Sequence, residues 1–206
     1  MTARLKPRQL LPRQVLVVDS FVSGEVCGQI LEDLDSSYWH SSSVLQRRSG
    51  RHHSEVREHF RASVTAEQFW FGPKLIRILA RIEKRLAILL PCDPLRLESW
   101  QATRYEKGGR FNYHVDGGYW KRSAAGDRKR TYLIYLDTPQ RGGETHFRAL
   151  DITVAPKPGR LVVWENLLPS GQCDHAMIHG GLEVRKGTKT TLVTWERERS
   201  LRKEDE

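Results

Sequence analysis

The chain has 206 residues, of which 38% are hydrophobic and 29% are charged. This length suits a single domain with a packed core, and the composition excludes a fibrous or largely disordered chain. The net charge of +9 at pH 7 is compatible with acidic partners, although a basic surface also serves solubility. The three cysteines include no Cys-x-x-Cys pair, which argues against a disulfide framework and predicts a reducing, cytoplasmic compartment.

No stretch approaches the roughly 18 apolar residues of a membrane span, and the basic N-terminus lacks the apolar segment of a signal peptide. We expect residues 1–13 to form a basic flexible tail. The apolar run 14–21 predicts a buried strand, and Ser23 is a suitable N-cap for a helix over 24–35. One face of that helix is apolar, and it carries Val26, Cys27, Ile30, Leu31 and Leu34.

The next segment is polar and rich in Arg and His. Residues 38–46 are predicted to contain a strand, and residues 47–61 to form a mobile loop. His52, His53 and His59 could form a second metal cluster, but solvent-exposed histidines are the better interpretation of this loop.

Gly72-Pro73 begins a predicted helix that ends near residue 90, before Pro91. Its apolar stripe consists of Leu75, Leu79, Ile82, Leu86 and Leu89. From residue 95 onward, short strands alternate with Gly- and Pro-containing turns, which predicts a double-stranded β-helix, or jelly roll. We therefore expect a mainly β protein with flanking helices (α+β). One domain spans 14–200, with a supporting part over 14–94 and a jelly-roll core over 95–200.

The pattern His114-Val115-Asp116 is typical of a metal site on a β-strand. Side chains two residues apart on a strand point to the same face, so His114 and Asp116 can reach one ion together. A third ligand must come from another strand, and His179 is the candidate. Two imidazoles and one carboxylate leave open positions on Fe(II) for a co-substrate and O₂. His175 is a weaker candidate for the third position, since no Gly-Gly follows it.

The segment after His179 reads as a strand, a tight turn at 186–188 and a returning strand that begins at Lys189. An inward-facing lysine on that strand would need an anion as its partner. A dicarboxylate that chelates the iron at one end would present its far carboxylate to Lys189.

Over about residues 95–200 the chain resembles the prolyl 4-hydroxylase branch of the Fe(II)/2-oxoglutarate dioxygenases. Six strings carry the resemblance in the same order. They are Arg104-Tyr105-Glu106 before Gly108-Gly109, Tyr113-His114-Val115-Asp116, Thr131 to Leu136, Gly142 to Phe147, Pro156 to Trp164, and His179-Gly180-Gly181 with Lys189 and Trp195.

The resemblance implies a role for each matched residue. His114, Asp116 and His179 would be the iron ligands. The C5 carboxylate of 2-oxoglutarate would be bound by Lys189 and Tyr105.

Further positions are implied around these two groups. Thr145 and Trp195 would line the 2-oxoglutarate pocket. On the substrate side we expect Arg128, Tyr119 and Trp120.

The implied activity is hydroxylation of an unactivated C–H bond with release of succinate and CO₂. Fe(II), 2-oxoglutarate and O₂ are the implied requirements, and L-ascorbate is a further candidate. A prolyl residue in a peptide or protein is one substrate class, and a free amino acid or small metabolite is another. Basic residues near the site favour an anionic substrate. A non-catalytic, metal-binding jelly roll is the alternative outside enzymes. Nucleic acid is not expected as a partner, because the chain lacks the arginine-rich end motif, with Arg and Asn after the distal histidine, that is expected of nucleic-acid demethylases of this fold.

Overall fold

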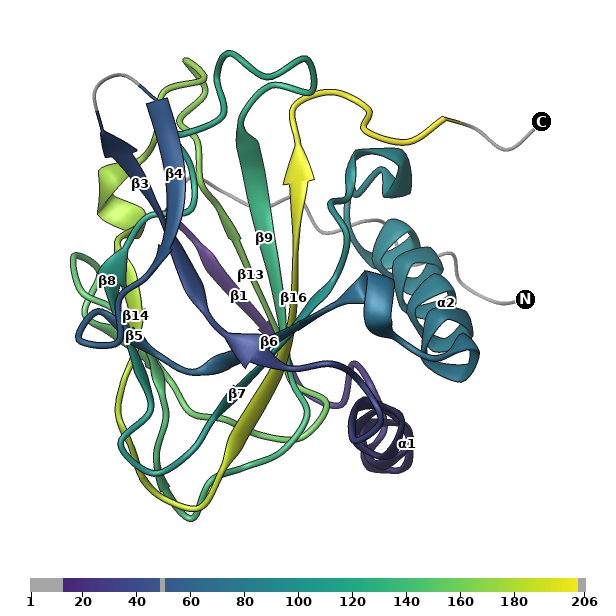
Figure 1. The fold of residues 1–206 in the computed structure, drawn as a ribbon. Coiled ribbons are helices and arrows are strands. Elements are labelled where there is room, and N and C mark those ends of the chain that lie inside the picture. The colour runs from purple at the N-terminus through teal and green to yellow at the C-terminus, as the bar shows by residue number, and fades with distance from the viewer. Residues whose placement is uncertain (1–12, 49–50, 204–206) are drawn as a thin grey trace.

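The computed structural model describes residues 13–48 and 51–203, and the side chains of residues 45–54 are outside the description. Within these ranges the chain folds into two facing β-sheets with two α-helices packed on the outside of the larger sheet (Figure 1). The larger sheet contains, in spatial order, β1 (Val15–Val18), β13 (Leu161–Glu165), β9 (Arg128–Tyr135), β16 (Lys189–Arg197), β7 (Gln101–Tyr105), β6 (Val64–Glu67) and β2 (His40–Ser41). The smaller sheet contains β12 (Ile152–Val154), β11 (Thr145–Phe147), β14 (His179–Gly181), β8 (Arg110–His114) and β5 (Arg61–Ala62). The predicted jelly roll is confirmed.

Two helices cover the larger sheet on the side away from β8 and β14 (Figure 1). Helix α1 (Gly24–Leu34) begins at Ser23, whose hydroxyl accepts a hydrogen bond from the Val26 N–H, as the N-cap prediction required. Helix α2 (Pro73–Leu89) buries the predicted apolar stripe, with Leu89 only partly covered. Short 3-10 helices connect the larger elements: η1 (Gln68–Trp70), η2 (Pro94–Arg96) and η3 (His175–Met177).

Strand alternation separates two hydrophobic cores on the faces of the larger sheet. On β13, Leu161 and Val163 point toward the helices, and Val162 and Trp164 point toward the smaller sheet. The same period places Leu192 of β16 in the helix-facing core. The other face of β16 is therefore available to line a space between the two sheets.

The segment 47–61 differs from the loop expected there. It contains β4 (Arg51–Val56), which pairs antiparallel with β3 (Ser43–Arg48), and then β5 of the smaller sheet. A two-stranded hairpin satisfies its backbone hydrogen bonds internally, so a polar sequence with few apolar residues can still form strands. The side chain of His59 is exposed, and those of His52 and His53 lie outside the described part.

The segment from His179 to Lys189 also differs from the predicted hairpin. The His179 strand, β14, pairs with β11 and β8 in the smaller sheet, whereas Lys189 begins β16 in the larger one. Between them, β15 (Val184–Lys186) pairs with β10 (Arg141–Gly142). The chain therefore crosses between sheets here, and the two functional side chains approach each other across the space between the sheets.

The basic tail lies outside the described residues except for Arg13, which forms an ion pair with Asp174 at 3.4 Å. Cys27, Cys92 and Cys173 are free thiols, as expected for a chain without a disulfide framework. Among the helices of the described ranges, none has the length and apolar character needed to span a membrane.

Candidate metal and co-substrate site

The predicted metal ligands meet between the two sheets. His114 ends β8 and is directly paired with His179 of β14, while Asp116 follows two residues after His114. Asp116 Oδ1 lies 3.5 Å from His114 Nε2, and Asp116 Oδ2 lies 3.7 Å from His179 Nε2. One ligand atom from each residue lies within 4.8 Å of the others, and no other such group of three occurs in the described part of the chain.

Both histidines are oriented by the backbone. His114 Nδ1 lies 2.8 Å from the carbonyl oxygen of Asn112, and His179 Nδ1 lies 3.0 Å from that of Met177. A carbonyl can only accept, so each Nδ1 carries the proton and donates it. Each Nε2 then keeps a lone pair that is directed toward Asp116. This is the tautomer that a metal requires.

The electrostatics of the triad also suit a cation. Burial and, to a smaller extent, the neighbouring His114 lower the pKa of His179 to about 4. His179 is therefore neutral at pH 7 and able to ligate. Burial works against the charged form of Asp116, but the two histidines hold its pKa well below its usual value. A carboxylate with two neutral imidazoles is a donor set that fits Fe(II).

Asp116 is positioned by a chain of hydrogen bonds that the sequence did not indicate. The Thr131 hydroxyl donates to Asp116 Oδ2 at 2.7 Å, and Asn166 Nδ2 donates to the same hydroxyl at 2.8 Å. Thr131 and Asn166 are 1% and 2% exposed. Because the hydroxyl has its proton committed to Asp116, the carboxylate is fixed in one orientation. Thr131 begins one of the six strings that carry the resemblance, but no role was expected of it, and Asn166 lies outside all six.

A small chamber of about 70 Å³ adjoins the triad and is lined by Lys189, Tyr105, Thr145 and Trp195, among others. Lys189 is 2% exposed, and its Nζ donates to the Gly143 carbonyl at 3.0 Å and lies 4.3 Å from the centre of the Tyr105 ring. The four residues that we expected around 2-oxoglutarate therefore surround one space. The chamber contains a buried cation next to a candidate metal centre.

Local features keep this chamber open. A Cβ on Gly181 would lie 3.3 Å from Lys189 Nζ, so the glycine two residues after His179 leaves room for the ammonium group. Thr145 is fixed because its hydroxyl accepts from the buried Tyr135 hydroxyl at 2.6 Å. Burial raises the pKa of Tyr105, which keeps its phenol protonated and able to donate a hydrogen bond.

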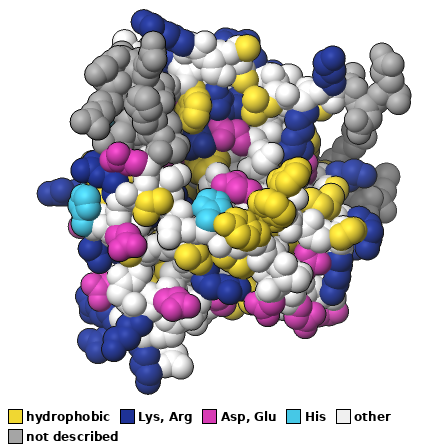
Figure 2. Space-filling view, in the orientation of Figure 1, with side chains coloured by type: hydrophobic (Ala, Val, Ile, Leu, Met, Phe, Trp, Pro, Cys, Tyr) yellow, Lys and Arg dark blue, Asp and Glu magenta, His cyan; other side chains and the backbone are white. Residues whose placement is uncertain are grey.

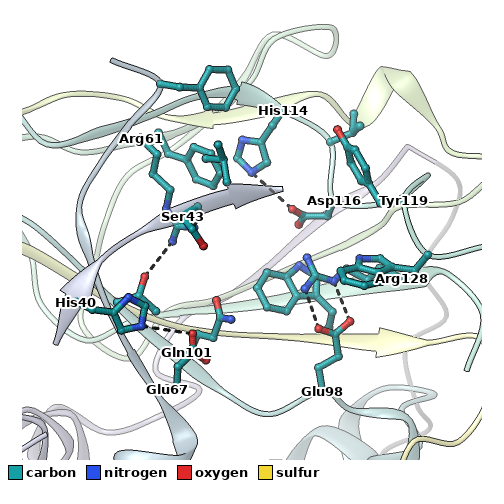
Figure 3. Close-up of a pocket in the computed structure, with 17 residues that line it drawn as sticks. His40, Ser43, Arg61, Glu67, Glu98, Gln101, His114, Asp116, Tyr119 and Arg128 are labelled. Atoms are coloured by element: carbon teal, nitrogen blue, oxygen red, sulfur yellow. Dashed lines mark hydrogen bonds and ion pairs between the residues drawn. The ribbon is translucent and has the colours of Figure 1, made fainter. Parts of the chain in front are cut away.

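A larger cavity of about 740 Å³ opens on the other side of Asp116 (Figure 3). Tyr119, Trp120 and Arg128 line it, as expected for the substrate side, and Trp195 lines both spaces. Figure 3 shows His40 and Glu67 at the end of the cavity away from Asp116.

Arg128 is held in the wall of the larger cavity by an ion pair with Glu98. Its guanidinium donates two hydrogen bonds of 2.8 Å to the Glu98 carboxylate and lies 3.6 Å from the centre of the Trp195 ring. Glu98 also accepts from Arg197 Nη1 at 2.9 Å, so one carboxylate is shared by two arginines, and the preference for an anionic substrate stays a prediction. Glu98 was not apparent as a site residue because its partner Arg128 lies 30 residues away in the sequence.

Two more residues escaped the sequence analysis. Arg61 lines both spaces, donates to the Thr103 hydroxyl at 3.2 Å and covers the Phe111 ring at 4.5 Å. Asp127 is fully buried, and its carboxylate accepts hydrogen bonds from the backbone of the Gly118–Trp120 loop. An arginine in a polar stretch and an aspartate before a strand carry no sequence signal of their own.

Two histidines lie outside the triad. His175 is exposed on η3 and is not among the grouped ligands, which agrees with the choice of His179. His146 Nδ1 lies 2.5 Å from the Tyr113 hydroxyl on the smaller sheet.

Comparison with known proteins places this geometry in a family. The sequence model of the 2OG-Fe(II) oxygenase superfamily matches residues 100–197, which include the triad and Lys189. The chain belongs to this superfamily. Prolyl 4-hydroxylase subunit alpha-1 of Gallus gallus is 32% identical over 147 residues, which cover 68% of this chain and 28% of that protein. Prolyl 4-hydroxylase 1 of Arabidopsis thaliana is 27% identical over 203 residues, which cover 91% and 70% of the two chains.

Solved structures support the fold assignment of this oxygenase-superfamily chain. The viral collagen prolyl hydroxylase of Paramecium Bursaria Chlorella virus-1 has a TM-score of 0.59 and 21% identity, over 89% of this chain and 95% of that one. A prolyl hydroxylase from Trichoplax adhaerens, solved with a hypoxia inducible factor peptide, has a TM-score of 0.63 and 14% identity, over 89% and 83%. The chain spans 28% of the length of the Gallus gallus subunit.

Proposed function

We propose that the chain is an Fe(II)- and 2-oxoglutarate-dependent dioxygenase that hydroxylates a prolyl residue of a peptide or protein. The observation that carries the proposal is the position of Lys189. A buried ammonium lines a small chamber that also touches His114, Asp116 and His179. A metal site alone would not need a buried cation beside it. A chelating dicarboxylate needs the metal ion for one end and the cation for its far carboxylate.

His114, Asp116 and His179 would hold the iron. When bound, Fe(II) would supply the activation of O₂ and the oxidation of the substrate C–H bond. The protein contributes orientation: Asn112 and Met177 fix the imidazoles, and Thr131 fixes the carboxylate.

Lys189 and Tyr105 would bind the C5 carboxylate of 2-oxoglutarate. The ammonium offers a charge-assisted hydrogen bond, and the neutral phenol adds a second donor. Thr145 and Trp195 would form the walls of the chamber. Its small volume of about 70 Å³ favours a compact dicarboxylate and leaves little space for bulk water.

The larger cavity would bind the substrate residue. Tyr119, Trp120 and Trp195 give it aromatic walls next to Asp116, and Arg128 is already paired with Glu98. Aromatic walls suit an apolar ring such as that of proline. The size of the cavity, about 740 Å³, suits a polypeptide segment better than a free amino acid. The names of the relatives point to the same substrate class.

The test has two steps. Anaerobic addition of Fe(II) and then 2-oxoglutarate to the purified chain should produce the weak visible charge-transfer band of the chelate. With O₂ and a proline-containing peptide, succinate should then be released. His179→Ala should lose both signals.

Lys189→Ala should raise the 2-oxoglutarate concentration needed for half-maximal signal at least tenfold. Lys186→Ala, which removes an exposed lysine three residues away, is the matched control and should behave as the native chain. A band without succinate release would favour the non-catalytic binding protein. The absence of any band under saturating conditions would contradict the co-substrate assignment.

A further inference from the structure

Three large aromatic side chains lie exposed beside one another on the surface. Tyr38 is 58% exposed, Phe69 85% and Trp70 51%. The ring of Trp70 lies 5.4 Å from that of Tyr38 and 5.1 Å from that of Phe69, measured between centroids. Figure 2 shows a hydrophobic patch near the middle of this face, beside a histidine. Single exposed aromatic residues are ordinary, but a contiguous group indicates an interaction surface. We call Tyr38, Phe69 and Trp70 the aromatic shelf.

The backbone holds the Phe69–Trp70 part of the shelf in place. The Gln68 N–H donates to the Trp100 carbonyl at 2.9 Å, and the Gln68 side-chain oxygen accepts from the Trp100 N–H at 2.7 Å. Phe71, the next residue in the chain, is buried in the helix-facing core. Because both flanks of η1 are anchored, Phe69 and Trp70 are presented to solvent by a rigid segment.

The position of Tyr38 is set by its neighbour Trp39, which is anchored to the protein. Trp39 donates from Nε1 to the Leu34 carbonyl at 2.9 Å, and the guanidinium of Arg104 covers the Trp39 ring at 4.4 Å. With Trp39 anchored inward, Tyr38 faces outward next to Trp70. A rigid shelf loses little conformational entropy when a ligand binds.

The shelf continues the large cavity outward. The Tyr38 ring lies 6.2 Å from the ring of His40, and His40 and Glu67 both line the cavity at its end away from Asp116 (Figure 3). His40 Nε2 lies 3.9 Å from Glu67 Oε1, so these two side chains form one polar rim. A ligand that enters at Asp116 and leaves over this rim reaches the shelf.

We infer that the aromatic shelf binds the substrate polypeptide, in an extended polyproline II conformation, at residues that flank the one placed near Asp116. This inference rests on the proposed function. Polyproline II segments dock on aromatic surfaces because their conformation is preformed and their rings lie flat against aromatic faces. A small metabolite held at Asp116 would not extend to the shelf.

The size of the shelf favours a peptide over a second copy of the chain. At the exposed fractions given above, the three aromatic side chains present on the order of 400 Å² of accessible surface to solvent. A stable interface between folded proteins buries roughly 800 Å² on each partner. The shelf is about half of that, which matches a few residues of an extended chain.

The experiment uses the full chain and fluorescein-labelled decaproline, with binding followed by fluorescence anisotropy. Phe69→Ala and Trp70→Ala should each raise the dissociation constant at least tenfold, as for anchor residues of an interface. Ile88→Ala removes another exposed apolar side chain, 63% exposed on α2, and should leave binding within twofold of the native value. A Gly-Ser peptide of equal length should not bind. Thermal melting confirms that each variant is folded.

Binding is measured without turnover, so the result is separate from the succinate test of the proposed function. Equal binding by the native chain and both shelf variants would overturn the inference, as would no binding of decaproline by the native chain. Sedimentation velocity tests whether a second copy of the chain occupies the shelf. A native dimer that Trp70→Ala converts to a monomer would assign the shelf to a second copy and also overturn the inference.

Discussion

At the scale of single residues, Lys189 shows how burial adjusts a cation to its ligand. Burial lowers the pKa of Lys189 to about 8, and the carboxylates of Asp137 and Glu144 oppose this only in part. A buried ammonium near its pKa gains strongly from an incoming carboxylate, because the new partner stabilises the charged form. The residue is therefore selective for an anion that fits the chamber.

The lowered pKa of Lys189 predicts a pH dependence of 2-oxoglutarate binding. Below pH 8 the ammonium is charged and binding is at its strongest. Above pH 8 the free protein loses this proton, and the affinity should fall by up to about tenfold per pH unit, because binding must take the proton up again. Calorimetric titrations between pH 6.5 and 9.5 would measure the slope.

Lys189→Arg is the control for this pH dependence, since arginine stays protonated throughout the range. The variant should give an affinity that does not change between pH 7.5 and 9.5. A flat profile for the native chain would contradict the lowered pKa of Lys189 or its role in binding, and the affinity of Lys189→Ala would tell these two apart.

Thr131 is expected to act on the proposed metal site through Asp116. Replacement by valine keeps the shape and removes the 2.7 Å hydrogen bond to Asp116 Oδ2, together with the partner of Asn166. Loss of such an outer contact costs roughly 10- to 100-fold in metal affinity. Titration of Thr131→Val with Fe(II) under anaerobic conditions should show this loss. Thr153→Val, at an exposed position of β12, should bind Fe(II) as the native chain does.

At the scale of elements, a glycine turn joins the larger sheet to the segment before α1. Gly159 has a φ of +74°, and its N–H donates to the Tyr135 carbonyl at 2.8 Å. The Gly159 carbonyl in turn accepts from the Val22 N–H at 3.1 Å. A Cβ at this position would lie 1.8 Å from the Val22 carbonyl oxygen. The turn therefore needs glycine for conformation and for space.

Two glycine variants separate these requirements. Gly108 also has a positive φ, of +85°, but a Cβ there meets nothing within 4 Å. Gly108→Ala should cost about 1–2 kcal/mol of unfolding free energy from backbone strain alone. Gly159→Ala should cost more than about 3 kcal/mol, because the clash with backbone adds to the strain. Urea denaturation of both variants measures the difference, and equal costs would contradict the steric part of the argument.

At the scale of the whole molecule, one buried charge network connects the larger sheet to the end of α2. Arg130 is 3% exposed and pairs with Glu165 and Glu196. Its Nη1 also donates to the carbonyl of Pro91, just after α2, at 3.0 Å. Burial alone would lower the pKa of Arg130, but its tyrosine and glutamate neighbours raise it above the usual value.

Removal of this central cation should be costly. Arg130→Ala leaves Glu196, 2% exposed, without its charged partner, and breaking a buried pair in this way costs about 3–5 kcal/mol. The free energy of unfolding from urea titration at pH 7 measures the loss. Arg77→Ala removes an exposed arginine of α2 and should change stability by less than about 0.5 kcal/mol. A small effect of Arg130→Ala would mean that the carboxylates find other partners or become protonated.

The sequence alone determined the residues that carry a local pattern. The two-residue spacing correctly paired His114 with Asp116, although β8 ends at His114 and Asp116 lies in the bend that follows, and a 3.6-residue period marked the buried side of α2. Gly-Gly after His179 and the distance to Lys189 indicated the third ligand and the anion-binding lysine. These signals are readable because strand and helix geometry relate near neighbours in sequence.

The tertiary structure decided which distant residues meet. It separated His179 and Lys189 onto different sheets, folded the polar segment 43–56 into a hairpin and paired Arg128 with Glu98. Each of these contacts depends on a partner far away in the chain. Local periodicity reports which face of an element is buried, but it does not identify the element that covers that face. The charge state of the substrate wall was therefore beyond the sequence, since it rests on a pair whose members are 30 residues apart.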